Sequence, residues 1–194
     1  MIASARLHPG LRILDLATGT GDLAFLASAR GASVVGLDIT WRMLELAAAK
    51  KTGAAPSFVR ADMMALPFAN GTFDVVTTGY GIRNVPDLGR ALDEIARVVG
   101  REGQFLSLDF DRPANRAVRG FYLAYLTAVG SLLGLLLHGD PDTYRYIPAS
   151  LRQYPGSQAV AQMLRARGFA RTEVIPVLGG LLAIHRACRI GPEG

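Results

Sequence analysis

The chain has 194 residues, enough for one domain with a well-buried core and too few for two full domains. Half of the residues are hydrophobic and 19% are charged, which excludes a disordered chain. The formal net charge is +5, and such a balance suits a nucleic acid, an anionic membrane surface or an acidic substrate without distinguishing among them.

Two features favour a reducing, cytoplasmic location. Cys188 is the only cysteine, which excludes a disulfide framework and a cysteine zinc site. Residues 1–10 lack the apolar core of a signal peptide. We therefore expect a cytoplasmic protein.

The first predicted element is a buried strand over residues 13–16, followed by a glycine turn and a helix over about 22–29. Gly19 and Gly21 allow a sharp turn and let a ligand approach the main chain. The helix then presents free N–H groups and the positive end of its dipole. This pattern is typical of a nucleotide-type cofactor site, and it also fits the glycine motif of dinucleotide binders. A strand, turn and helix without a ligand is the alternative.

Strands and helices continue to alternate along the chain. Further strands are predicted over 33–38, 57–62, 73–80, 104–110, 171–177 and 181–188, with helices over 41–51, 87–99 and 157–167 and a turn over 100–103. The alternation predicts an α/β fold in a single domain over residues 1–194. We expect the Rossmann-like seven-stranded sheet of class I methyltransferases, mostly parallel with an antiparallel C-terminal strand.

Three acids lie in or directly after the first three predicted strands. Asp38 can accept both hydroxyls of a ribose, as in NAD and S-adenosylmethionine sites alike. Asp15 can hold a cationic amino group, which S-adenosylmethionine has, whereas it would repel a pyrophosphate. Asp62 is placed to accept the exocyclic amine of an adenine. Each acid alone could cap the next helix, but the three together favour S-adenosyl-L-methionine as the cofactor.

At this point the sequence resembles the ubiquinone/menaquinone biosynthesis C-methyltransferases, a family of class I S-adenosylmethionine-dependent enzymes. The resemblance spans nearly the whole chain. Its blocks are 13–23, Gly36-Leu37-Asp38-Ile39, 65–68, Thr72-Phe73-Asp74, 80–85, Arg97-Val98-Val99, Tyr144-Arg145-Tyr146 and 183–186. The resemblance implies cofactor contacts at Thr20, Asp38, Asp62, Met63 and Gly79.

The resemblance also implies methylation of a ring carbon of a prenylated hydroquinone, either demethylmenaquinol or a ubiquinone precursor. Arg83 and Asn84 follow the fourth strand, at the same sheet edge as the acids, and we predict that they are catalytic. Arginine is a poor base because its guanidinium stays protonated in proteins, so Arg83 would stabilise the developing phenolate electrostatically. Asn84 would orient the hydroxyl or a water that accepts its proton. The alternative is a pair that fixes the loop through backbone hydrogen bonds.

Residues 120–137 carry no charge, and these 18 residues reach the lower limit for a membrane-spanning helix. A span between two strands of one sheet would break the domain, so we reject it. A core helix on the sheet is one interpretation. The other, which we favour, is an apolar lid within 113–155 that accepts a prenyl tail and touches the inner face of the membrane. Arg112, Arg116 and Arg119 would then meet anionic headgroups.

Other functions are less well supported. His138 and His185 have no partner at ligand spacing, so no metal site is predicted, and His185 is expected to be structural. A nucleic-acid substrate is disfavoured because no Asn/Asp-Pro-Pro-Tyr/Phe motif follows the fourth strand. A class I methyltransferase for another phenol or a lipid headgroup, and a non-catalytic binding module, remain alternatives.

The sequence departs from the family at three places. Leu108-Asp109-Phe110-Asp111 replaces a typical Leu-Glu-Phe-Ser, and Ser131 stands where relatives often have proline. Few residues precede the first strand, so either the start is misplaced or the site is unusually open. The exact substrate stays open on these grounds. A homodimer is also left open.

Overall fold

The computed structural model describes residues 8–50, 55–111, 116–139 and 146–189. Seven strands form one sheet in the order β3-β2-β1-β4-β5-β7-β6. Their bounds are β1 Arg12–Leu16, β2 Ser33–Asp38, β3 Ser57–Arg60, β4 Phe73–Gly79, β5 Val99–Phe110, β6 Arg171–Val177 and β7 Leu182–Cys188. Strands β1 to β5 are parallel to their neighbours in that group, and β7 is antiparallel to both β5 and β6. The predicted fold class is confirmed.

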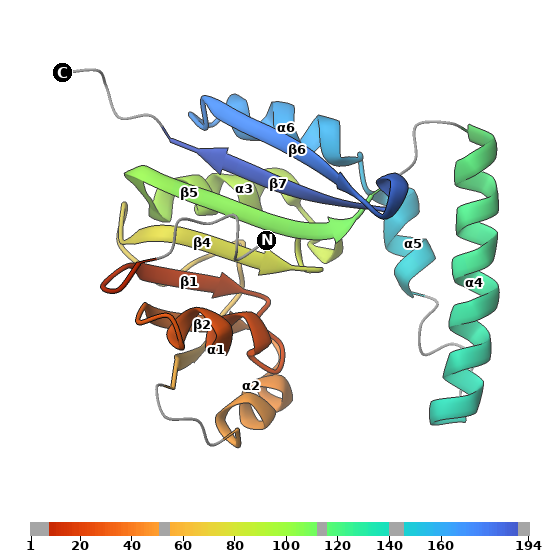
Figure 1. Ribbon diagram of the computed structural model, residues 1–194, viewed down its shortest axis with the longest axis horizontal. Helices are drawn as coiled ribbons and strands as arrows, with labels where there is room; N and C mark the ends of the chain where they lie inside the picture. Colours follow the sequence, from red (N-terminus) through yellow and green to blue (C-terminus); the bar gives the residue numbers. More distant parts are fainter. Residues whose placement is uncertain (1–7, 51–54, 112–115, 140–145, 190–194) are drawn as a thin grey trace.

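The sheet is covered on both faces, as a parallel sheet requires. The helices in the body of the fold are α1 Asp22–Ser28, α2 Trp41–Ala48, α3 Leu88–Val98 and α6 Ser157–Arg165 (Figure 1). Consecutive strand residues point to opposite faces. Thus Ile13 packs with α1 residues in one apolar cluster, whereas Leu14 packs with α3 and α6 residues in the other.

The predicted turn over 100–103 is wrong, because β5 begins at Val99 and runs through it. Phe73 pairs with Val99, but Val75 pairs with Gln104, so the intervening residues of β5 form a bulge. A Cβ atom on Gly103 would lie 2.7 Å from Val99 Cγ1 and 3.0 Å from the Asp74 carbonyl. Only glycine fits this bulge. Other element ends differ from prediction by one to three residues.

Helix α4 (Arg116–His138) stands beyond the carboxyl ends of the central strands, beside α5 (Tyr146–Gln153), and does not cover a face of the sheet (Figure 1). The core-helix interpretation is therefore wrong. Tyr122 is buried and donates from its hydroxyl to the Leu181 carbonyl at 3.2 Å. Within the described ranges, no helix has the length and apolarity that crossing a bilayer requires.

Arg112, Tyr144 and Arg145 lie outside the described residues, as do the side chains of Arg116 and Arg119.

Candidate active site

A cavity of about 290 Å³ opens at the carboxyl ends of β1, β2 and β4. This is the edge at which open α/β sheets bind ligands. Five of the ten predicted site residues line it: Asp38, Asp62, Met63, Gly79 and Asn84. The fold therefore brings together predicted residues from three segments of the chain, the end of β2, the loop after β3 and the stretch 79–84.

The glycine turn after β1 has the predicted left-handed conformation, with φ of +55° at Gly19 and +82° at Gly21. Asp38 connects this turn to the end of β2. One of its carboxylate oxygens accepts from Gly19 N at 2.9 Å, and the other accepts from Thr40 N at 2.8 Å. The Thr20 hydroxyl lies 3.2 Å from an Asp22 carboxylate oxygen. The turn is thus fixed by main-chain donors, and Asp38 sits in the cavity wall.

Asp15 lies beneath the turn and does not line the cavity. Its side chain is almost inaccessible, and its two oxygens accept hydrogen bonds from the Thr18 and Thr77 hydroxyls, each at 2.6 Å. Burial raises the pKa of the Asp15 carboxyl to about 6. These contacts support the turn from below, so the described geometry differs from the direct contact with an amino group predicted for Asp15.

The opposite wall combines a carboxylate with apolar side chains. Asp62 accepts from Met64 N at 2.8 Å, which fixes the start of the loop after β3. Met63 is buried, and Ile39 projects from the end of β2 beside it in the cavity wall. This wall therefore has the apolar surface and the acceptor that a flat ring with an amine at its edge would require.

Two glycines of the cavity wall, Gly79 and Gly81, are packed closely against neighbouring residues. A Cβ atom on Gly81 would lie 2.6 Å from Thr78 Oγ1 and 2.7 Å from Ala17 Cβ. A Cβ atom on Gly79 would lie 3.1 Å from Leu23 Cδ1. A side chain at Gly81 is therefore excluded, and one at Gly79 would press on Leu23.

Sequence reasoning missed two strained residues in the same cavity wall. Ala17 and Tyr80 follow β1 and β4 with φ of +49° and +58°, the left-handed region that residues with a Cβ atom seldom adopt. Such strain is typical of functional sites, where the surrounding structure imposes it. Neither residue type gives a sequence signal for this conformation.

Arg83 lies behind the cavity wall, on the short 3-10 turn η2 (Ile82–Asn84). Its guanidinium donates to Asp109 Oδ1 at 2.9 Å, and both side chains are 2% exposed. The guanidinium also lies 4.9 Å from the centre of the Phe110 ring. Burial raises the pKa of Asp109 to about 6, although Arg83 acts in the opposite direction. Asp109 was noted in the sequence only as a departure from the family, and its partner lies 26 residues away.

Asn84 lines the cavity, unlike its neighbour Arg83. Its side-chain amide donates to the Tyr80 carbonyl at 3.1 Å, and Arg83 donates to the same carbonyl at 3.3 Å. Two side-chain donors thus meet the main chain of Tyr80, which gives its left-handed conformation a structural cause. The loop-fixing contacts of the alternative interpretation are present, and the catalytic roles of both residues stay predictions.

A second buried polar group lies behind β5. The His185 ring nitrogens lie 2.8 Å from the Ser107 hydroxyl and 2.8 Å from the Ser157 carbonyl, and burial lowers the pKa of the imidazole. Asp111 accepts from both the main chain and the hydroxyl of Ser157. His185 is therefore a satisfied structural residue, as predicted. Among the described residues, no three His, Cys, Asp or Glu side chains are grouped to hold a metal ion.

The sheet order and the cavity at its carboxyl edge define a class I S-adenosylmethionine-dependent methyltransferase fold. An S-adenosylmethionine-dependent methyltransferase of Aquifex aeolicus superposes with a TM-score of 0.67, at 16% identity, over 97% of this chain and 87% of that one. A phosphoethanolamine N-methyltransferase of Haemonchus contortus superposes with a TM-score of 0.69, at 15% identity, over 96% of this chain and 50% of that one. At this identity the likeness concerns the fold alone.

The chain belongs to the ubiE/COQ5 methyltransferase family, whose model matches residues 2–189. A demethylmenaquinone methyltransferase of Thermus thermophilus is 42% identical, over 90% of this chain and 80% of its own. A ubiquinone/menaquinone biosynthesis C-methyltransferase of Rhizobium johnstonii is 37% identical, over 95% of this chain and 74% of its own. The resemblance inferred from the sequence motifs is confirmed, and S-adenosyl-L-methionine is the cofactor that family and fold imply.

The residues present fit this cofactor. Asp38 would accept ribose hydroxyls, and Asp62 with Met63 would hold the adenine. Gly79 lies in the cavity wall, whereas Gly19, Thr20 and Gly21 form the turn held by Asp38 and do not line the cavity. When bound, the cofactor supplies a methyl group on a positively charged sulfur.

Proposed function

We propose that this protein methylates a ring carbon of a prenylated hydroquinone in quinone biosynthesis. The observation that carries the proposal is the family match over residues 2–189, together with relatives named for demethylmenaquinone and for ubiquinone/menaquinone biosynthesis. The cavity supports it, because its carboxylates are arranged for a nucleoside and its rim is apolar.

On the substrate side we propose separate roles for the two residues of η2. Asn84 is at the cavity surface and would orient the ring hydroxyl or a water that accepts its proton. Arg83 would stabilise the phenolate from behind the wall, through the low-dielectric interior in which both it and Asp109 lie. The phenolate makes the adjacent ring carbon nucleophilic, and a fixed orientation supplies the in-line alignment.

Turnover of Arg83→Ala tests this assignment. We expect at least about a hundredfold loss of kcat with nearly unchanged affinity for S-adenosylhomocysteine, as for the loss of one electrostatic stabiliser. Arg83→Lys keeps the charge and should retain part of the activity. Lost binding of S-adenosylhomocysteine in both variants would show that Arg83 acts on the cofactor side through the loop.

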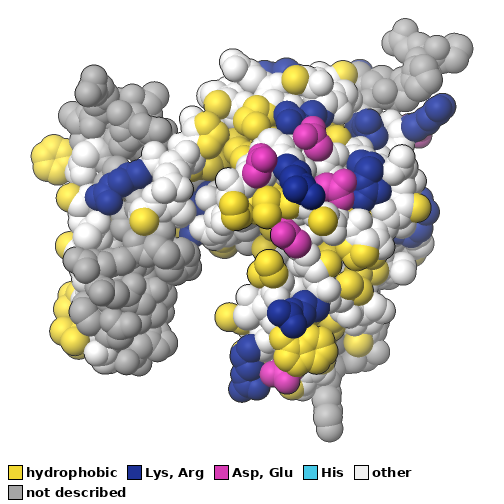
Figure 2. All heavy atoms as spheres, turned by 180° about the vertical axis from the view of Figure 1, so that it is seen from behind, with side chains coloured by type: hydrophobic (Ala, Val, Ile, Leu, Met, Phe, Trp, Pro, Cys, Tyr) yellow, Lys and Arg dark blue, Asp and Glu magenta, His cyan; other side chains and the backbone are white. Residues whose placement is uncertain are grey.

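We further propose that α4 is an apolar lid that accepts the prenyl tail and touches the inner face of the membrane. Phe121, Tyr125, Leu132 and Leu136 are exposed at spacings that place them on one side of the helix. Figure 2 shows hydrophobic side chains along the outer edge of the column on the left of the view, away from the body of the fold. Such a face is unusual on a monomer in water and is typical of an interaction surface.

Co-sedimentation with phosphatidylglycerol vesicles tests the lid. Phe121→Ser with Leu136→Ser should weaken vesicle binding and raise the KM for a long-tailed quinol. Trp41→Ser is the matched control, because Trp41 is also exposed but lies on α2, a separate helix drawn below the sheet in Figure 1. Equal vesicle binding by both variants would contradict membrane contact through α4.

The substrate itself is tested by turnover with demethylmenaquinol, a demethylated benzoquinol, a simple phenol and a phospholipid headgroup. We expect a C-methylated quinol as the product. Methylation of the phenol or headgroup alone would replace the quinone assignment. Calorimetry with S-adenosylhomocysteine separates an enzyme from a non-catalytic module, which would not bind it.

A further inference from the structure

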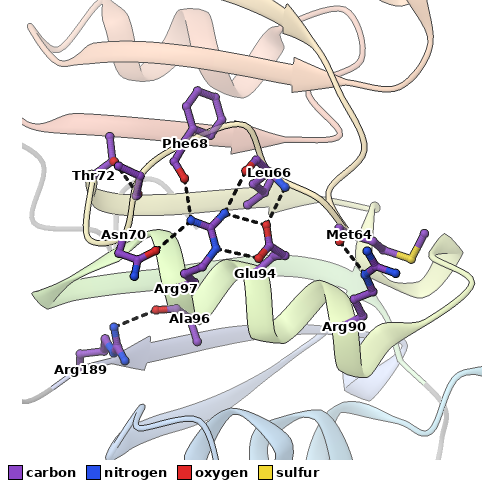
Figure 3. Close-up of polar contacts among 11 residues, drawn as sticks. Met64, Leu66, Phe68, Asn70, Thr72, Arg90, Glu94, Ala96, Arg97 and Arg189 are labelled. Carbon is purple, nitrogen blue, oxygen red and sulfur yellow. Dashed lines mark hydrogen bonds and ion pairs between the residues drawn. The ribbon is translucent and has the colours of Figure 1, made fainter.

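The loop between β3 and β4 forms the wall of the cavity that carries Asp62, Met63 and Met64. Charged side chains of α3 bind the main chain of this loop (Figure 3). Arg97 donates to the Phe68 carbonyl at 2.6 Å and to the Leu66 carbonyl at 2.9 Å. The loop therefore depends on a helix from the next crossover for its conformation.

Glu94 and Arg90 complete this arrangement. Glu94 accepts from Leu66 N at 2.7 Å and from two nitrogens of Arg97, each at 2.7 Å. Arg90 donates to the carbonyl of Met64, itself a residue of the cavity wall, at 2.9 Å. We call Arg90, Glu94 and Arg97 the α3 clamp.

The chemistry of the clamp is specific to arginine at position 97. Its planar fork binds Glu94 in a bidentate manner while its outer nitrogens reach two carbonyls and the Asn70 side chain. A lysine ammonium is a single point and cannot reach these acceptors together. The hydrogen bond from Arg97 lowers the pKa of Glu94, so the pair stays charged at neutral pH.

We propose that the α3 clamp is a positioning group for the cofactor, and that Arg97 keeps Asp62 and Met63 in place for the adenine ring. This inference rests on the proposed placement of the adenine at that wall. Main-chain groups of a loop must find partners, and here α3 side chains provide them at Met64, Leu66 and Phe68. Loss of these partners would leave the main-chain groups of the wall to adopt other positions, and none of the clamp's hydrogen bonds given above is made to η2.

Calorimetry with S-adenosylhomocysteine on Arg97→Ala tests the clamp. We expect affinity to fall about tenfold or more, as for the loss of hydrogen bonds to a charged group. At saturating S-adenosylmethionine, kcat should stay within about twofold to threefold of wild type. Arg97→Lys should show a smaller loss of affinity and guards against a variant that fails to fold.

Arg189→Ala is the matched control. Arg189 also donates to two main-chain carbonyls near the end of α3, at Ala96 and Val99, but makes no described contact with the loop (Figure 3). Its substitution should lower the melting temperature yet leave the affinity for S-adenosylhomocysteine unchanged.

Base selectivity gives a readout that a purely structural role would not move. The wild-type protein should prefer S-adenosylhomocysteine to S-inosylhomocysteine, which lacks the exocyclic amine, and Arg97→Ala should lose that preference. Unchanged affinity and selectivity in Arg97→Ala would overturn the clamp while leaving the proposed function intact. A wild-type protein that binds neither ligand would overturn the proposed function itself, and the clamp with it.

Discussion

Asp15 and Asp109 stand near the ends of two central strands, and both are almost fully buried, yet their partners differ. Asp15 accepts hydrogen bonds from two neutral hydroxyls, those of Thr18 and Thr77. Asp109 forms an ion pair with the guanidinium of Arg83, and this pair is buried in the interior. A buried carboxyl with neutral partners can lose its charge and keep its hydrogen bonds. A buried ion pair cannot lose one member without leaving the other charge unpaired.

The largest expected effect follows from breaking the ion pair. Asp109→Asn should lower the free energy of unfolding by about 3–5 kcal/mol, because the buried Arg83 guanidinium loses the carboxylate charge that pairs with it. Urea denaturation measures this change. Asp93→Asn breaks the exposed pair with Arg167 and should cost less than about 1 kcal/mol. A similar small loss for Asp109→Asn would contradict the comparison.

Removing both charges of the ion pair tests the comparison of Asp15 with Asp109 further. Arg83→Met combined with Asp109→Leu should recover about 2 kcal/mol of the stability lost in Asp109→Asn, since neither member of the ion pair is left unpaired. Turnover should not recover, because the proposed phenolate stabiliser is gone. Urea denaturation and a turnover assay on the double variant check both parts. Recovered turnover would contradict the role of Arg83.

Asp15 is expected to show its effect in the pH dependence of stability. Its pKa is raised by burial, so the fold favours the protonated form, and this contribution is lost as the pH rises through about 6. Between pH 5 and 7.5 wild type should therefore lose about 1 kcal/mol relative to Asp15→Asn, in which the titration is absent. Urea denaturation at the two pH values measures the difference. A constant gap would mean that Asp15 is not titrating in this range.

The smallest expected effect concerns the left-handed residue after β1. Ala17→Gly removes the clash of Cβ in that conformation and should raise the free energy of unfolding by up to about 1 kcal/mol. Thermal unfolding is the measurement. Ala27→Gly, inside α1, is the control and should have the opposite sign. A loss of stability in Ala17→Gly would show that φ at Ala17 carries no strain.

Much of the fold followed from local pattern. The alternation of apolar runs with amphipathic segments predicted all seven strands, and the acids at strand ends predicted where Asp38 and Asp62 lie. The bulge at the start of β5 was not predictable, because it depends on how Phe73 and Val75 pair across the sheet. Gly100 and Gly103 favour a turn by residue type, but pairing across the sheet places both of them within β5.

The site was predicted less completely than the fold. Arg83 and Asn84 are neighbours in sequence, so they were expected to act side by side, but only Asn84 lines the cavity. The difference comes from Asp109, which binds Arg83 from another strand and leaves no local signal. Strain at Ala17 and Tyr80 likewise arises from the surrounding structure rather than from residue type.

The two edge strands of the sheet, β3 and β6, limit how copies of this chain can associate. β3 has only four residues, follows Pro56 and ends at Arg60, while β6 contains Pro176 and the charged Arg171 and Glu173. The prolines and charges, together with the short length of β3, oppose the addition of a further strand at either edge. Such strand addition is the usual route to uncontrolled aggregation. A homodimer of this protein would therefore have to form through helices or loops rather than by extending the sheet.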